Sequence, residues 1–492
     1  MRTIHWALGL LLLAFTLSAC STTKNTMSTG PATSDPRWAA IDSLAGLGQY
    51  ASALERTDAL LAEAQTSGEW RLEFAAWARR AVFQELTGVV PDSIIQPLEQ
   101  RAATAPVPLA QLLHSTLMDR WWQRYQRDRW RIMDRTELDG SFDANDPDTW
   151  TQGRFMERII REAQASLEPY DTLRHIPVDE LAELLVGDPA AIPLRPTVYD
   201  VLAHRALRIF SNTETRLAEP SWRFSLNDPR DFELFEPFLS RSLRHRDSTS
   251  WEFQALRLYQ RLERLHINAD KLDAYVDVVL QRLTYVRERS VLPGKDSLYL
   301  GALELLRTRL PNEASEAEVM VAIARWHEEM AAKYDRLRGD DWKWERKTAV
   351  GLCKEAVAKW PNTFGARNAA ALLARMQQPS VSITTEQAVP PGREFLALVK
   401  YRNTTKAWVR IVSDPDRGDN ERRYDLEHHA WLLKQKPVKE WSIELPDDGD
   451  LNEHAVEVAI EGLPLGRYAL LVSNGASFAR DLETISWCGV QV

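Results

Sequence analysis

Apolar residues recur at helical spacing along most of this chain, from about residue 37 to residue 378. The first series has four members at intervals of three residues: Trp38, Ile41, Leu44 and Leu47. Spacings of three and four residues place side chains on one face of an α-helix. Gly48-Gln49-Tyr50 follows this series and separates it from the next one, so we expect two helices joined by a turn.

The residues around this turn are close to one tetratricopeptide unit, in which small side chains let two antiparallel helices approach each other closely. A second partial match begins at Cys353 and continues through Trp360, Pro361 and Asn362 to an alanine-rich stretch. The pattern fixes no strict period. It therefore predicts a tetratricopeptide-like array of helical hairpins over residues 37–378.

The pattern changes at about residue 379, where prolines and a glycine interrupt the helical spacing. Beyond this break apolar and polar residues alternate in short runs, such as the one through Phe395, Ala397 and Val399. Alternation with a period of two is typical of half-buried β-strands, and several such runs separated by turn residues indicate a β-sandwich. We therefore expect a β-sandwich domain over residues 379–492, and this domain is either complete or truncated.

The first twenty residues follow a different pattern. Arg2 and His5 precede an apolar run at residues 6–17, which is too short to span a bilayer and is typical of a secretory signal. The next residues, Leu17-Ser18-Ala19-Cys20, resemble the lipobox of bacterial lipoproteins. This resemblance implies a signal peptide at residues 1–19 and lipid attached to Cys20.

Residues 20–36 are rich in Ser, Thr, Gly and Pro, so we expect a flexible tether between the lipid and the folded domains. In known lipoproteins a residue such as Ser21 after the cysteine implies delivery to the outer membrane. The predicted location is therefore the outer membrane, on either its periplasmic or its surface face, with the membrane as a partner through the N-terminal lipid.

Composition narrows the possible functions. The 61 Lys and Arg residues are outnumbered by 70 Asp and Glu residues, and the net charge of −9 argues against nucleic acid as a partner. Cys353 and Cys488 are the only cysteines after Cys20, and we expect both to be free thiols. Many of the 18 tryptophans lie at helical spacing, which predicts large contacts between helices.

Residues 120–131 (RWWQRYQRDRWR) alternate basic and aromatic side chains. Grooves that bind single-stranded nucleic acid use such residues. A structural interpretation is that the aromatic rings pack inward while the arginine stems cover apolar surface. The acidic composition and the predicted export favour the structural interpretation, and leave lipopolysaccharide or lipid head groups as the polyanions to consider.

Oxygen-bearing side chains gather in one predicted loop: Asp139, Asp143, Asn145, Asp146 and Asp148. A calcium loop needs ligands at alternating positions and a glutamate at the twelfth. Counted from Asp139, the third position is Ser141 and the twelfth is Trp150, so the pattern does not fit. We expect a solvated turn in which Asp148 caps a helix.

Two histidine motifs also lack a complete site. His327-Glu328-Glu329 begins like a zinc-protease helix, but no second histidine follows four residues after the first. His428 and His429 adjoin each other in a predicted charged loop, where neighbouring side chains point apart. Neither motif predicts a metal site.

Two further segments have structural explanations. Residues 475–479 (GASFA) are similar to a nucleophile elbow, but they lack the final glycine and a following helix. Asp200 and His204 lie four apart on an apolar helix, where we expect a structural pair. The residues therefore predict a protein that is not an enzyme and uses no cofactor or metal.

Four segments resemble a known family: residues 193–207 (PLRPTVYDVLAHRAL), 257–262 (RLYQRL), 401–403 (YRN) and 463–468 (LPLGRY). Together with the lipobox they resemble the N-terminal region of bacterial, Bacteroidetes-type alpha-2-macroglobulin-like lipoproteins. The resemblance implies that the β-sandwich is of the macroglobulin type and that the chain belongs to an envelope system that inhibits proteases by trapping them.

Family members trap a protease after it cleaves a bait segment, and many capture it through a Cys-Gly-Glu-Gln thioester. Here Cys488 is followed by Gly489, Val490 and Gln491, which keeps the spacing but replaces the glutamate. Cys353 has no glutamine three residues later. The resemblance therefore implies a scaffold or binding module that lacks the thioester and bait regions, with proteases or another envelope protein as partners.

A lipid-anchored outer-membrane glycan-binding protein with tetratricopeptide-like helices is the alternative. In that case tryptophans would form an exposed platform for sugars, whereas tryptophans buried between helices would oppose it.

Overall fold

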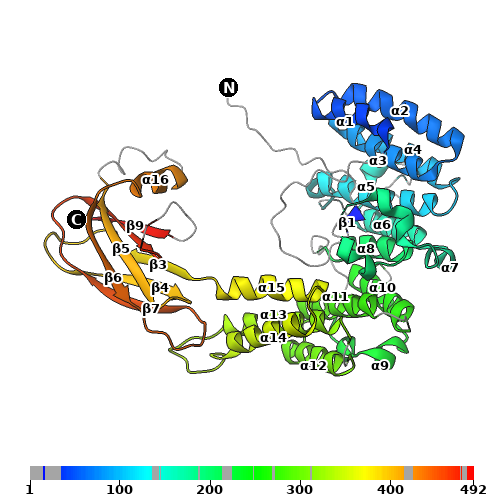
Figure 1. Cartoon of the computed structure of the whole chain (residues 1–492). Helices are drawn as coiled ribbons and strands as arrows, with labels where there is room; N and C mark the ends of the chain where they lie inside the picture. The colour runs from blue at the N-terminus through cyan, green and yellow to red at the C-terminus, as the bar shows by residue number, and fades with distance from the viewer. Residues whose placement is uncertain are drawn as a thin grey trace. The chain divides into compact units, whose positions relative to one another are not determined.

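The computed structural model describes residues 15–16, 35–133, 135, 143, 146–186, 189–212, 224–247, 249–268, 272–310, 313–414, 425–476, 478 and 485–492 (Figure 1). The chain folds into two compact units, Met1–Ser315 and Glu316–Val492. Within the described ranges, no helix combines the length and the hydropathy that a membrane span requires.

The first unit is almost entirely helical. Its α-helices are α1 (Ala39–Gly46), α2 (Tyr50–Ser67), α3 (Trp70–Leu86), α4 (Pro91–Ala102), α5 (Leu109–Met133), α6 (Gln152–Ser166), α7 (Tyr170–Leu173), α8 (Val198–Phe210), α9 (Phe235–Leu239), α10 (Trp251–His266), α11 (Asp273–Arg289) and α12 (Lys295–Thr308). Its 3-10 helices are η1 (Pro36–Trp38), η2 (Pro147–Thr149), η3 (Val178–Leu184), η4 (Pro189–Leu194) and η5 (Pro229–Phe232).

Two short strands, β1 (Phe15–Thr16) and β2 (Leu185–Val186), pair in parallel. β1 lies in the segment that the sequence predicts to be removed with the signal peptide.

Short links turn the helices back on one another. Gly68, whose φ of 74° suits glycine, caps the C-terminus of α2, and α3 begins two residues later. A link of this length makes neighbouring helices antiparallel. Consecutive helices pack together in pairs such as α2 with α3 and α4 with α5 (Figure 1), which confirms a helical array. The first apolar series differs at its end: α1 stops at Gly46, and Leu47 is 71% exposed.

The arginine- and tryptophan-rich segment lies on α5, which packs against α4, α6 and α8. Trp121, Trp122 and Tyr125 are buried. The Trp121 ring stacks on Trp150 at 5.1 Å between centroids, and the Trp122 ring lies 5.1 Å from that of Trp251 in α10. The structural interpretation is therefore confirmed for these three aromatic side chains and wrong for Trp130 of the same segment, which is 69% exposed.

Buried ion pairs join the helices of the first unit. Arg282 of α11 and Glu263 of α10 are both fully buried, with 2.5 Å between Nε and Oε1. The same guanidinium donates to the backbone oxygens of Asp231 and Glu233 beside η5. Burial raises the pKa of Glu263, while the Arg282 charge acts against that rise. One side chain thus connects three segments of the fold.

The side chain of Asp200 does not pair with the side chain of His204, although the sequence led us to expect that pair. The Asp200 carboxylate completes a capping box with Thr197 at the start of α8, and its other oxygen lies 2.6 Å from Nε2 of His266 in α10. His204 Nδ1 instead lies 2.8 Å from the backbone oxygen of Asp200. The side-chain pair therefore forms across two helices, because α10 brings His266 to the buried carboxylate.

The second unit contains three helices followed by two antiparallel sheets. Its elements are α13 (Glu316–Ala331), α14 (Glu345–Lys359), α15 (Phe364–Gln377), β3 (Ser380–Thr385), β4 (Phe395–Arg402), β5 (Lys406–Ser413), α16 (Asp425–Leu432), β6 (Pro437–Glu444), β7 (His454–Ile460), β8 (Arg467–Ser473) and β9 (Ile485–Gln491). The strand orders are β3-β4-β7 and β6-β5-β8-β9.

The two sheets share one apolar core. Ile383 and Val399 of the first sheet belong to the same buried cluster as Val409, Ile411 and Leu470 of the second. These residues come from the alternating runs of the sequence, because every second side chain of a strand points to one face. The outer face of the second sheet is covered around Leu432 of α16. This arrangement confirms a C-terminal β-domain after the helices.

Small residues allow close packing among α13, α14 and α15. A Cβ on Gly365 of α15 would lie 2.6 Å from Cβ of Ala317 in α13, so only glycine fits there. Helix gives way to strand between Gln377 and Ser380, close to the boundary expected from the pattern. The compact units divide earlier, however, and place these three helices with the sheets.

The buried Arg282–Glu263 pair should contribute far more to the free energy of unfolding than an exposed ion pair does. Arg282→Ala leaves Glu263 without its partner, and we expect a loss of about 3–5 kcal/mol in the free energy of unfolding. Arg154→Ala, which removes the exposed pair with Glu157 on α6, should cost less than about 1 kcal/mol. Urea denaturation followed by circular dichroism measures both.

A double variant provides the matched comparison. Arg282→Met with Glu263→Leu leaves no unpaired buried charge, so it should be less destabilised than Arg282→Ala. Equal losses for the two would show that the ion pair is not the source of the effect.

Candidate functional site

The structure describes Cys353 of α14 and Cys488 of β9, and Cys20 lies outside the described residues. Neither of the two forms a disulfide bond with a described residue, as the sequence predicted. Burial raises the pKa of the Cys353 thiol to about 12. The reactive thiolate is therefore scarce at neutral pH.

Two of the histidines singled out in the sequence, His327 and His428, each lie beside a carboxylate. His327 Nδ1 pairs with Glu345 at the start of α14. His428 and His429 lie on α16 rather than in a loop, and His428 Nε2 is 3.1 Å from Asp414 Oδ2. Such pairs orient the rings and account for them structurally.

The acidic loop is only partly described, because Asp139 and Asn145 lie outside the described residues. Asp146, rather than Asp148, caps the short helix η2. Asp148 Oδ1 instead forms ion pairs with Nη2 of Arg124 at 2.5 Å and Nη2 of Arg131 at 3.0 Å. The hydrogen bond from Arg124 lowers the pKa of the Asp148 carboxyl. The prediction that Asp148 caps a helix is therefore wrong, because its carboxylate pairs with arginines of α5.

Gly475 lies in a turn after β8, while Ser477 and Ala479 of the elbow-like segment lie outside the described residues.

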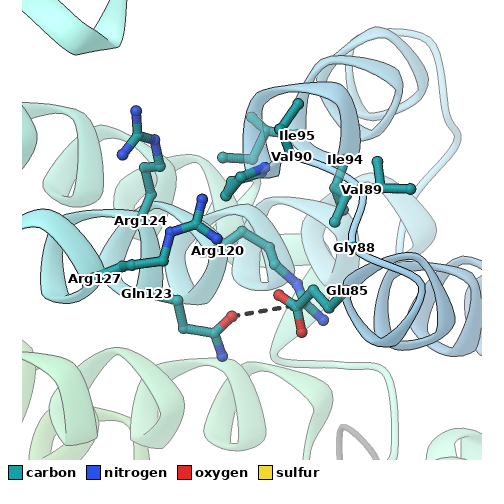
Figure 2. Close-up of a pocket in the computed structure, with 11 residues that line it drawn as sticks. Glu85, Gly88, Val89, Val90, Ile94, Ile95, Arg120, Gln123, Arg124 and Arg127 are labelled. Carbon is teal, nitrogen blue, oxygen red and sulfur yellow. Dashed lines mark hydrogen bonds and ion pairs between the residues drawn. The ribbon is translucent and has the colours of Figure 1, made fainter.

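A groove in the first unit combines apolar and basic side chains (Figure 2). It has a volume of about 290 Å³ and lies between α5 and the loop that joins α3 to α4. The apolar wall comes from the loop and α4, with Val89, Val90, Pro91, Ile94 and Ile95. The polar wall comes from α5 and the end of α3, with Arg120, Gln123, Arg124, Arg127 and Glu85. Val90 is 60% exposed, so part of the apolar wall faces solvent.

Helical spacing explains the polar wall. Arg120, Arg124 and Arg127 stand at positions i, i+4 and i+7 of α5, which places them along one side of the helix. The aromatic residues between them point into the core. The helix therefore presents arginines to the groove while its other side is buried.

The three arginines differ in how far their charge is balanced. Arg120 pairs with Glu85 and also donates to Gln123 at 3.1 Å. Arg124 pairs with three carboxylates, those of Asp92, Asp128 and Asp148.

Arg127 is exposed and makes no ion pair with any described residue. The groove thus offers an available cation next to an apolar wall, a combination that suits a ligand with an anionic group and an apolar group.

Tryptophan exposure bears on sugar binding. Seven described tryptophans are buried: Trp38, Trp77, Trp121, Trp122, Trp150, Trp251 and Trp326. The most exposed ones are Trp130 at 69%, Trp344 at 49% and Trp342 at 39%. The last two flank Lys343 between α13 and α14, whereas most of the others lie partly or fully inside the fold.

No protein-family model matches this chain, and no curated protein sequence does so either. The function of this chain is therefore inferred from its residues and their geometry.

Residue spacing predicts that the three arginines lie on one side of a helix, but it does not predict the groove beside them. Their positions on one side of α5 follow from intervals of four and three residues. The apolar wall does not follow from spacing, because Val90 and Ile94 reach Arg124 only after α4 packs on α5.

Burial of Cys353 predicts a large difference in alkylation. At pH 8 iodoacetamide should label Cys353 only after denaturation, because both burial and the raised pKa suppress the native thiolate. Cys488, which is only partly buried, should react faster in the native protein. Peptide mass spectrometry measures both, and rapid native labelling of Cys353 would contradict the assignment.

Proposed function

We propose that this chain is a non-catalytic, lipid-anchored protein of the cell envelope that acts as a scaffold or binding module. In this proposal Cys20 attaches the protein to the outer membrane, and the helical array binds a partner protein. The groove on α5 is the observation that supports binding, since it places the cation of Arg127 beside exposed apolar surface.

The partner that best fits the groove is an acidic protein segment that also has an apolar side chain. A carboxylate can form paired hydrogen bonds with a guanidinium, and the apolar side chain can cover Val90. Anionic lipid would satisfy Arg127 equally well. Val90 is exposed in the apolar wall, whereas Ile94 and Ile95 are buried. This small exposed area favours one apolar side chain of a protein over a long acyl chain of a lipid.

The helical hairpins and the β-domain support the wider assignment. We propose that the hairpins are of the tetratricopeptide type and that the β-domain is a macroglobulin-like sandwich. The chain would then belong to an alpha-2-macroglobulin-like protease-inhibitor system as its N-terminal part. In this proposal the chain lacks the thioester and bait regions of that system.

Glycan binding is the second candidate, and Trp342 and Trp344 are the observation in its favour. Lys343 and Lys347 lie over the Trp344 ring at 5.4 Å and 5.3 Å from its centroid, so its face is already partly occupied. Seven described tryptophans are buried inside the fold and give no platform. The protein-binding proposal is therefore preferred.

Anchoring by Cys20 predicts a change of cell fraction. Cys20→Ser should move the protein from the membrane pellet to the soluble envelope fraction, because the lipid has no sulfur to attach to. Cys488→Ser, the same substitution at another cysteine, should leave it in the pellet. Immunoblots of fractionated cells measure this, and an unmoved Cys20→Ser protein would refute the anchor.

Binding at the groove predicts site-specific cross-linking in intact cells. A photoreactive phenylalanine at Gln123, which is exposed in the groove, should give a protein adduct that Arg127→Glu reduces several-fold. The same probe at Gln164, exposed on α6, is the matched control and should give none. A lipid adduct, or equal yields at both positions, would contradict binding of a protein partner here.

A further inference from the structure

Oxygen-bearing side chains alternate along the loop between β6 and β7 in the second unit. Asp448, Asp450 and Asn452 occupy every second position, and Gly449 between them has a φ of 69°. One carboxylate oxygen from each aspartate and one ring nitrogen of His454 all lie within 4.8 Å of one another. Alternating oxygen ligands are also how the first half of a calcium loop is built.

Two oxygens in this loop are buried without a hydrogen-bond donor. Asp450 is fully buried and Asn452 is 4% exposed. Asp450 Oδ2 and Asn452 Oδ1 accept no hydrogen bond from any described residue. A buried oxygen without a partner is costly, and a bound ion is one of the few ways to satisfy it.

The remaining polar atoms of the loop are already used to hold it in place. Asp450 Oδ1 accepts from the Asn452 backbone N–H at 2.9 Å and lies 2.8 Å from His454 Nε2. Asn452 Nδ2 donates to the backbone oxygen of Lys343 at 2.8 Å. Each side chain is therefore oriented through one atom, which leaves Oδ2 of Asp450 and Oδ1 of Asn452 for a ligand.

One cation already lies beside the loop. The nearest competitor for the site is Lys343, whose Nζ lies 3.4 Å from Asp448 Oδ2. Asp448 is exposed and this contact is long, so an incoming ion could displace the ammonium.

We propose that Asp448, Asp450 and Asn452 bind a hard divalent cation, Ca²⁺, with His454 as a positioning residue that orients Asp450. Two carboxylates and an amide oxygen match the preference of Ca²⁺ for oxygen ligands. The loop is not an EF-hand, because Glu453 stands where that motif has glycine. Three protein side chains leave room for water ligands, and we expect a dissociation constant of about 10⁻⁴ to 10⁻³ M, as in extracellular modules.

The location gives the ion a structural role within the second unit. Arg346 of α14 donates to the backbone oxygen of Leu451 at 3.0 Å, and the Leu451 side chain packs against the core of α13–α15. His454 begins β7. Ca²⁺ bound here would therefore tie the helices of this unit to its sheet, which is a property independent of the groove and its partner.

Calorimetric titration of the EDTA-treated full chain with CaCl₂ tests this. Wild type should bind one Ca²⁺, and Asp450→Asn and Asp448→Asn should each weaken binding at least about tenfold, because each removes a charged ligand. Asp447→Asn, whose Oδ1 accepts only from the Gly449 backbone in this loop, is the matched control and should bind as wild type does.

Asp448→Asn alters an exposed residue, so it remains informative if Asp450→Asn does not fold. No Ca²⁺ binding by wild type up to about 10 mM, a concentration well above the expected dissociation constant, would overturn the proposal. Unchanged binding in Asp448→Asn would also do so. Binding of Zn²⁺ in preference to Ca²⁺ would overturn the oxygen-ligand assignment, since it would make His454 a ligand.

Discussion

The cost of burying charge constrains how the helices of the first unit pack against one another. An ion removed from water needs an opposite charge in good geometry, and at these sites the partner is on another helix. Asp119 of α5 pairs with Arg205 of α8, Asp200 of α8 with His266 of α10, and Glu263 of α10 with Arg282 of α11. Each helix of this series is therefore placed relative to the next by a pair that tolerates little displacement.

The helix α5 links this constraint to the proposed binding role. Its buried side holds Asp119 and the rings of Trp121 and Trp122, so its rotation about its own axis is determined by the core. That rotation directs Arg124 and Arg127 into the groove. A ligand that binds here meets backbone that is already fixed, which favours recognition on a rigid helix over recognition on a loop.

The second unit depends less on ion pairs and more on apolar alternation. Its two sheets share one apolar core, to which β4 and β5 contribute a buried side chain at alternate positions, while close packing at Gly365 holds its helices. The loop from Asp448 to Asn452 lies where these two parts meet. A cation there would supply the electrostatic constraint that buried pairs supply in the first unit.

The sequence by itself determined that helices extend to about residue 378 and that strands follow, because both periods follow from local backbone geometry; it did not indicate α16. It also determined that Trp121 and Tyr125 face inward, and it contained the alternation at Asp448, Asp450 and Asn452, which on its own indicates no more than a turn. Tertiary structure alone decided that Asp200 meets His266, 66 residues away, rather than His204. It also decided that Val90 faces the arginines and that α13–α15 belong with the sheets. Residue spacing specifies neighbours within one helix or strand, whereas contacts between elements depend on how all their side chains pack together.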